Sequence, residues 1–260
     1  MINQASNSPL ISIILPVHNA GYYLSSCLDS ILKQSYEHFE IIAIDDLSRD
    51  DSWKILKLYR SLDKRIKIYR NIKKYGKYIT LNRILRKTKR QYVVFMDAKD
   101  MMYKDKLKKQ LSFLMQHKKA VAVGTQCTFL SQDNKRIGIS SYPHENDAIY
   151  HQPIHGISVH FETLMVNKYL LPKDLLYFTN NDKILYSSLL VKLLTFGQII
   201  NLPFALQYQR EHKEVSTSPL KHLSSLLQLG IQSLTEQEYR PSIRKYLYNT
   251  FWKPTFTSSQ

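Results

Sequence analysis

The N-terminal half of the chain alternates short apolar runs with segments whose apolar residues recur at helical spacing. Runs that are apolar almost throughout are typical of strands covered on both faces. Such strands are predicted at residues 11–17, 40–44, 65–69 and 92–96. Helices are predicted in the intervals, at residues 22–34, across the segment from Trp53 to Leu58, and at residues 78–88. Strands that alternate with helices indicate βαβ units, so the pattern predicts an α/β fold with a mostly parallel sheet.

Acidic residues follow two of these predicted strands directly. Asp45 and Asp46 come at the end of the second strand, and Asp97 and Asp100 follow the fourth. The carboxyl ends of parallel strands share one edge of a sheet, where open α/β folds bind ligands, so we expect these carboxylates to form one site. The end of the first strand brings to the same edge Pro16, Val17 and Asn19.

A crevice of this kind suits a nucleotide. Carboxylates accept hydrogen bonds from base N–H groups or ribose hydroxyls, and apolar Val17 can pack against a base. A diphosphate needs a cation, either a divalent metal held by carboxylates or a fixed basic side chain. The sequence contains neither G-x-G-x-x-G nor G-x-x-x-x-G-K-[ST], so dinucleotide-binding and P-loop sites lack their phosphate-binding loop.

Composition narrows the partners. The 260 residues include 37 Lys and Arg against 21 Asp and Glu, a net charge of +16, which calls for an anionic partner such as a nucleic acid, a phosphorylated small molecule or a membrane surface. Cys27 and Cys127 have no metal-ligand spacing, which favours a reducing cytoplasm over a disulfide framework. With no secretory signal pattern and no long apolar run, we expect a protein that is neither secreted nor membrane-spanning.

Several short motifs occur in a familiar order. They are residues 13–19 (IILPVHN), residues 40–48 (EIIAIDDLS), Gly76, Asn82, residues 95–100 (FMDAKD), His155-Gly156, Asn181-Asp182, and residues 207–212 (QYQREH). Together they resemble the successive motifs of family-2 glycosyltransferases, which have the GT-A fold. The resemblance runs from about Ile11 to Ser216, which predicts a GT-A domain over residues 1–216 and a helical C-terminal extension over 217–260.

The resemblance implies a nucleotide-sugar donor, expected to be a UDP-sugar, and a saccharide or lipid-linked acceptor in surface polysaccharide or glycoconjugate synthesis. It implies inversion by one displacement, with Asp182 as the general base, Asp45 on the nucleotide base, and Asp97 near the ribose and diphosphate. His212 is a candidate diphosphate contact. The donor-binding residues that it implies are Pro16, Val17, Asn19, Asp45, Asp46, Gly76, Asn82, Asp97, Lys99 and His212.

The chain departs from the family at a metal-binding position. The family normally has Asp-x-Asp after the fourth strand, with the second Asp on Mg²⁺ or Mn²⁺, but Lys99 stands there. Three alternatives follow: Asp97 and Asp100 hold the ion in another geometry, the Lys99 ammonium neutralises the diphosphate without a metal, or catalysis has been lost and the domain binds a nucleotide or a partner. The arginine that often precedes Asn82 is here Leu81, and nearby lysines can replace it.

The positive charge is concentrated between Lys54 and Lys109, where twenty Lys and Arg accompany four Asp. A solvated face is one interpretation, and attraction to an anionic membrane leaflet is the functional one, with the protein peripheral on the inner face of the plasma membrane. A nucleic-acid-binding protein is the rival, but no motif for one is present, so nucleic acid is not expected as a partner. Amphipathic helices predicted at 219–234 and 240–252 would pack on the domain or form a membrane or dimer interface.

Overall fold

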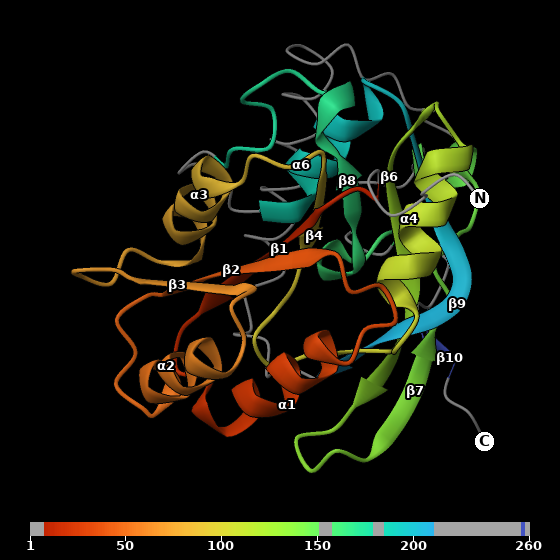
Figure 1. The fold of residues 1–260 in the computed structure, drawn as a ribbon. Coiled ribbons are helices and arrows are strands. Elements are labelled where there is room, and N and C mark those ends of the chain that lie inside the picture. Colours follow the sequence, from red (N-terminus) through yellow and green to blue (C-terminus); the bar gives the residue numbers. More distant parts are fainter. Residues whose placement is uncertain (1–7, 151–157, 179–184, 211–255, 258–260) are drawn as a thin grey trace, which may run out of the picture.

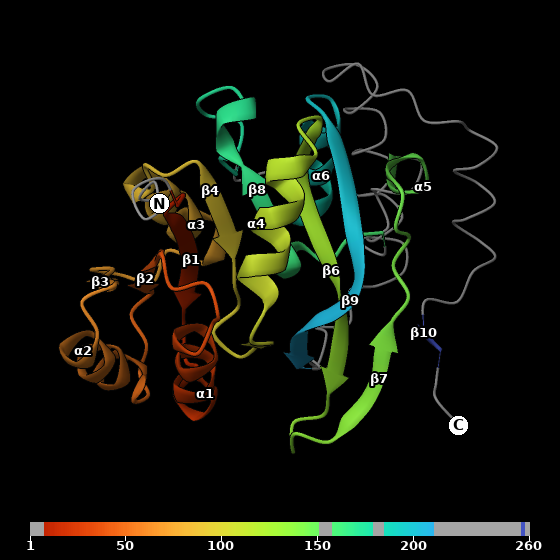
Figure 2. The same ribbon diagram turned by 45° about the vertical axis from the view of Figure 1, so that its right-hand side comes forward.

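The computed structural model describes residues 8–150, 158–178, 185–210 and 256–257, and for residues 185–188 and 256–257 the backbone alone. Its strands form one sheet in the order β10-β7-β6-β8-β4-β1-β2-β3, with β9 beside β6 and β5 beside β9. Figure 2 shows this sheet from β3 at one side to β7 at the other. The expected α/β fold class is confirmed (Figure 1).

The first half of the sheet has the predicted parallel arrangement. All three contacts among its four strands are parallel, between β1 and β2, β2 and β3, and β1 and β4. The strands are β1 (Ile11–Val17), β2 (Phe39–Asp45), β3 (Ile66–Arg70) and β4 (Tyr92–Phe95). The helices between them are α1 (Gly21–Leu32), α2 (Ser52–Leu62) and α3 (Lys77–Lys87).

Both faces of this half are covered, which explains the unbroken apolar runs. Ile11, Ile13 and Leu15 of β1 pack into a core shared with α1 and α2, whereas Ile14 packs into a second core shared with α3. In Figure 1, α1 and α2 lie below the sheet, and α3 lies above it. Because successive side chains of a strand point to opposite faces, a strand between two helical layers needs apolar residues at nearly every position.

The second half of the sheet mixes strand directions. Strand β8 (Met165–Asn167) lies antiparallel between β4 and β6 (Ala120–Leu130), and β9 (Gln198–Arg210) runs parallel to β6. The shorter strands are β5 (Met101–Met102), β7 (Arg136–Ser140) and β10 (Phe256–Thr257). The remaining helices are α4 (Lys106–Gln116), α5 (Asn146–Tyr150), α6 (Leu185–Leu194) and the 3₁₀ turns η3 (Phe161–Thr163) and η4 (Lys168–Leu170).

The structure does not test the predictions for the C-terminal part of the chain. The helices expected at 219–234 and 240–252, and the domain boundary at 216, lie outside the described residues. Within the part of the chain that the structure describes, no helix combines the length and the apolar character that a membrane span requires. Cys27 and Cys127 are free and buried.

Candidate active site

A pocket of about 210 Å³ opens at the carboxyl edge of the parallel strands. Its walls come from the ends of β1, β2 and β4 and from the segment that leads from β3 into α3. The lining residues are Pro16, Val17, His18, Ala20, Asp46, Lys74, Gly76, Lys77, Thr80, Asp97, Ala98 and Lys99. A larger hollow of about 350 Å³ follows the outer edge of β3, but no residue predicted for the site lines it.

The pocket brings together six of the residues that the sequence analysis proposed for the donor. These are Pro16, Val17, Asp46, Gly76, Asp97 and Lys99. Asn19, Asp45, Asn82 and Asp100 do not line it. Asp182 and His212, with His155 and Asn181, lie outside the described residues, so their expected roles stay predictions.

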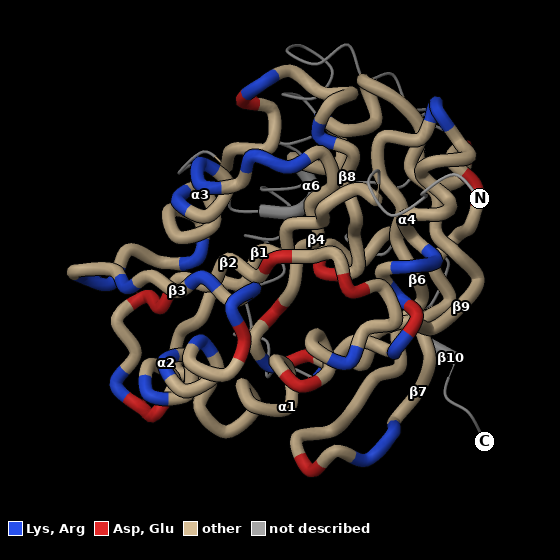
Figure 3. Tube along the Cα trace, in the orientation of Figure 1, with Lys and Arg blue, Asp and Glu red and all other residues tan. Residues whose placement is uncertain are grey.

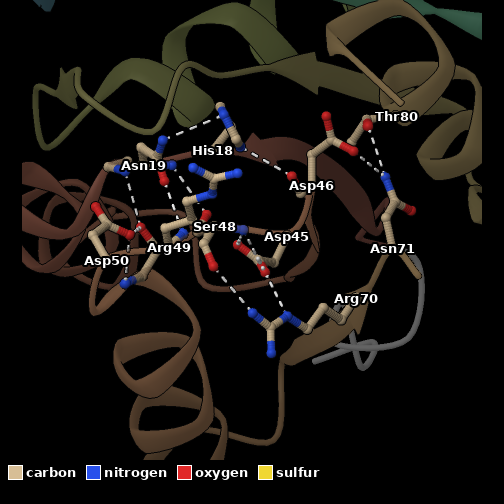
Figure 4. A network of polar contacts seen from close by, with 12 residues as sticks. His18, Asn19, Asp45, Asp46, Ser48, Arg49, Asp50, Arg70, Asn71 and Thr80 are labelled. Carbon is tan, nitrogen blue, oxygen red and sulfur yellow. Dashed lines mark hydrogen bonds and ion pairs between the residues drawn. The ribbon is translucent and has the colours of Figure 1, made fainter. Parts of the chain in front are cut away.

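Asp45 is buried beneath the pocket. One of its carboxylate oxygens accepts a hydrogen bond from Arg70 Nε at 2.9 Å, and both oxygens lie within 3.3 Å of the backbone N–H of Ser48 (Figure 4). Arg70 also donates to the Ser48 carbonyl. Nearby, the Asn19 side chain accepts from the Arg49 N–H at 2.9 Å. In this structure Asp45 and Asn19 therefore shape the loops behind the pocket.

Asp46, the next residue, faces the pocket and organises its wall. Its carboxylate accepts hydrogen bonds from the backbone N–H groups of Tyr75 and Gly76, at 2.8 and 2.7 Å, and from Asn71 Nδ2 at 2.7 Å. Burial opposes ionisation, but these three donors outweigh it and lower the pKa of Asp46 below its ordinary value. Gly76 has φ of +86°, a conformation that favours glycine, and α3 begins directly after it.

A charged cluster includes two further lining residues, Lys77 and Asp97. Lys77 Nζ lies 3.2 Å from Asp97 Oδ2 and 3.1 Å from Glu162 Oε1. The other oxygen of Asp97 accepts the backbone N–H of Lys99 at 3.0 Å, and the other oxygen of Glu162 lies 3.2 Å from His160 Nε2. Burial lowers the pKa of His160. Sequence reasoning did not identify Glu162 or His160, which belong to no motif and come from the segment at η3.

Asp100 does not line the pocket. It is 1% exposed; one oxygen accepts the Arg210 N–H at 3.0 Å and the other accepts Gln207 Nε2 at 3.0 Å. Burial, followed by the neighbouring Asp97 carboxylate, raises its pKa well above the ordinary value. Gln207 is also the acceptor for the fully buried Lys106, whose pKa burial lowers to about 8.

These contacts test whether the described residues suit Mg²⁺ or Mn²⁺, which prefer oxygen ligands. Both oxygens of Asp97 are already engaged, Asp100 is buried, and Lys99 places an ammonium where the family has a ligand. Within the described ranges, no group of three or more His, Cys, Asp or Glu residues is placed to hold a metal ion. The described side chains therefore do not form a set that fits a divalent ion.

Curated relatives match a little under half of the chain. An uncharacterized glycosyltransferase of Haemophilus influenzae is 42% identical over 111 residues, which is 43% of this chain and 44% of that protein. TuaG of Bacillus subtilis, whose name assigns it to teichuronic acid biosynthesis as a glycosyltransferase, is 37% identical over 125 residues, or 48% of this chain and 49% of TuaG. The matched segments thus span about half the length of these relatives.

Solved structures extend the likeness to most of the fold. S. aureus TarS 1–349 in complex with UDP-GlcNAc superposes with a TM-score of 0.71 at 18% identity, covering 93% of this chain and 73% of the 1–349 fragment. The mannosyltransferase PcManGT from Pyrobaculum calidifontis, in complex with GDP-Man and Mn²⁺, has a TM-score of 0.64 at 16% identity and covers 94% of this chain and 79% of that one. These neighbours confirm the expected GT-A architecture.

The family model for glycosyl transferase family 2 matches residues 12–167. This range includes β1 to β8, except for Ile11, and every pocket-lining residue. The chain therefore belongs to glycosyl transferase family 2.

Proposed function

We propose that the protein transfers a sugar from a nucleoside-diphosphate donor, expected to be a UDP-sugar, to a hydroxyl group of a saccharide or lipid-linked acceptor. One observation carries the proposal: the pocket combines an apolar wall, a buried carboxylate and three lysines at the carboxyl edge of the sheet. Those residues are Pro16 and Val17, Asp46, and Lys74, Lys77 and Lys99. Family membership and structural neighbours solved with UDP-GlcNAc and GDP-Man support the same donor class.

In this proposal the nucleotide base lies against Val17 and within reach of Asp46, and the three lysines surround the diphosphate. The family resemblance suggested Asp45 for the base, but Asp45 is fully buried and paired with Arg70, so Asp46 is the better placed carboxylate in this structure. An ionised carboxylate accepts hydrogen bonds only, as a partner for a base N–H must.

Our proposal for the sugar-transfer step rests on the resemblance to family-2 glycosyltransferases. Inversion by direct displacement needs a base opposite the leaving diphosphate, and Asp182 is the proposed base, which deprotonates the acceptor hydroxyl. We further propose a place in surface polysaccharide or glycoconjugate synthesis, which the name of TuaG supports. A peripheral position on the cytoplasmic face of the membrane would suit the basic residues on α2, β3 and α3 (Figure 3).

The test is a grid of UDP-, GDP- and CDP-sugars, each with Mn²⁺ or EDTA, read by thermal shift and then by nucleoside diphosphate release. We expect one nucleotide class to raise the melting temperature and to be turned over. Asp182→Asn should keep donor binding and lose release. If no donor shifts the melting temperature and none is hydrolysed, the proposal is refuted; binding without turnover would instead indicate a catalytically silent nucleotide-binding domain.

A further inference from the structure

We propose that the Lys77 ammonium, with Lys99 of the same pocket lining, takes the role of the divalent ion, so that the donor diphosphate is neutralised by the protein and its binding needs no metal. The inference rests on the proposed function, because it concerns how the same pocket holds a nucleotide diphosphate.

The position of Lys77 is the first observation. Its Nζ lies between two carboxylates from different parts of the fold, 3.2 Å from Asp97 Oδ2 and 3.1 Å from Glu162 Oε1. The carboxylate of Asp97 is 18% exposed and that of Glu162 is 8% exposed, whereas Lys77 is 39% exposed and lines the pocket. The two largely buried carboxylates thus fix the position of the Lys77 ammonium at the pocket wall.

The charges that line the pocket are the second observation. The lining includes the cations Lys74, Lys77 and Lys99 and the carboxylates Asp46 and Asp97. The carboxylate of Asp46 accepts three N–H donors, and that of Asp97 is paired with Lys77. With Glu162 counted, Lys77 and Lys99 offset the charges of Asp97 and Glu162, as a divalent ion on two carboxylates would. Lys77 is also the first residue of α3, where the helix dipole favours an anion.

The carboxylates that a metal would need are the third observation. Asp97 accepts the Lys99 N–H with one oxygen and the Lys77 ammonium with the other. Asp100 is buried with both oxygens bonded to Gln207 and Arg210. A divalent ion in this wall would have to displace Lys77 and lie close to Lys99, and each of these ammonium groups repels it. The same two charges attract a diphosphate.

Glu162 is a positioning residue in this arrangement. It lies 85 residues from Lys77 in the sequence, and its second oxygen is 3.2 Å from His160 Nε2. The buried Lys106 donates to the Glu162 backbone carbonyl at 3.3 Å, which links η3 to α4. Glu162, itself held by these contacts, therefore keeps the Lys77 ammonium at the pocket wall. A cation that is already held in place loses less side-chain entropy on binding a phosphate than a free one does.

The first experiment needs no variant. Binding of UDP and GDP is measured by calorimetry on the full chain in EDTA and in Mn²⁺, with uridine and guanosine as probes that lack the phosphates. We expect affinity for the bound nucleotide to change less than twofold between EDTA and Mn²⁺, and the diphosphate to bind much more tightly than its nucleoside. Loss of binding in EDTA with recovery in Mn²⁺ overturns the inference and leaves the proposed function standing. Absence of binding in both overturns the two together.

Variants then locate the charge. Lys77→Met should weaken diphosphate binding in EDTA at least tenfold and leave nucleoside binding unchanged, and Lys77→Arg should retain most of the affinity. Lys87→Gln is the matched control, because it removes a lysine from the other end of α3, where the ammonium lies over the Tyr69 ring. Equal affinity of Lys77→Met and wild type for the diphosphate would refute the assignment, as would a loss of the same size in Lys87→Gln.

Discussion

Replacing Asp46 with asparagine tests how the pocket wall is held. The Asp46 carboxylate is 3% exposed and accepts three hydrogen bonds of 2.7 to 2.8 Å, two of them from backbone N–H groups of the loop before α3. An asparagine is the same size but keeps one acceptor oxygen. Its amide NH₂ would then face a donor, which leaves one N–H without an acceptor.

The size of the effect follows from these bonds. A hydrogen bond to a charged group contributes about 1.5–3 kcal/mol, and an unsatisfied buried donor costs about 1–3 kcal/mol. Losing one bond and weakening two others should lower the free energy of unfolding by about 2–3 kcal/mol. For a protein whose total stability is of the order of 5–15 kcal/mol, this is a large fraction.

The loss of stability in Asp46→Asn should also depend on pH in a characteristic way. Because the folded state lowers the pKa of Asp46, its contribution is fully present above the unfolded pKa of about 3.9 and is lost as the pH falls through the folded pKa. The difference in unfolding free energy between wild type and Asp46→Asn should therefore be constant from about pH 5 to 8 and shrink below about pH 4.

Urea denaturation followed by circular dichroism measures this difference at each pH. Asp51→Asn is the matched control, since Asp51 lies nearby on the surface and pairs with exposed Lys54, and we expect little change from it. A loss below about 1 kcal/mol in Asp46→Asn, or a difference that stays constant down to pH 3, would refute the reasoning.

Three further predictions concern charge. The double variant Lys99→Asp/Lys77→Met places a second carboxylate beside Asp97 and removes the ammonium paired with it, so we expect Mn²⁺ to raise the melting temperature of its UDP complex; no effect of Mn²⁺ would contradict the alignment with the family's Asp-x-Asp motif. Burial holds the pKa of Lys106 at about 8, below its unfolded value of about 10.4, so wild-type stability should gain about 3 kcal/mol relative to Lys106→Met as the pH rises from 8 to 10.4, and parallel pH profiles would refute this. If the basic surface binds anionic lipid, co-sedimentation with phosphatidylglycerol vesicles should fall with salt and fall further in Lys57→Glu/Arg60→Glu; binding that both leave unchanged would exclude this surface.

The sequence predicted the parts of the fold that local pattern controls. The four N-terminal strands and the helices between them form where apolar periodicity placed them, because each strand packs on two helical layers and needs a continuous apolar run. The carboxyl edge then follows from parallel direction alone. Hence Val17, Asp46 and Asp97, which are far apart along the chain, line one pocket as expected.

Local pattern could not separate neighbours at a strand end. Asp45 and Asp46 both follow the apolar run of β2, but successive residues point in opposite directions. The first pairs with Arg70 beneath the pocket and the second lines the pocket. The period of a strand predicts that Asp45 and Asp46 point in opposite directions. Which of them lines the pocket depends on the position of Arg70, and only the fold gives that position.

The sequence pattern did not predict which residues far apart in the chain would contact each other, and these contacts determine the chemistry of the pocket. Asn82 matches a family motif, yet its amide is engaged by the backbone of Phe178, 96 residues away. Asp100 sits in the expected place, yet Gln207 takes one of its oxygens. Lys99 alone therefore left the metal question open. In the structure Glu162, which no motif marks, and Asp97 together hold the Lys77 ammonium, and our proposal that the diphosphate is bound without a metal rests on this long-range contact.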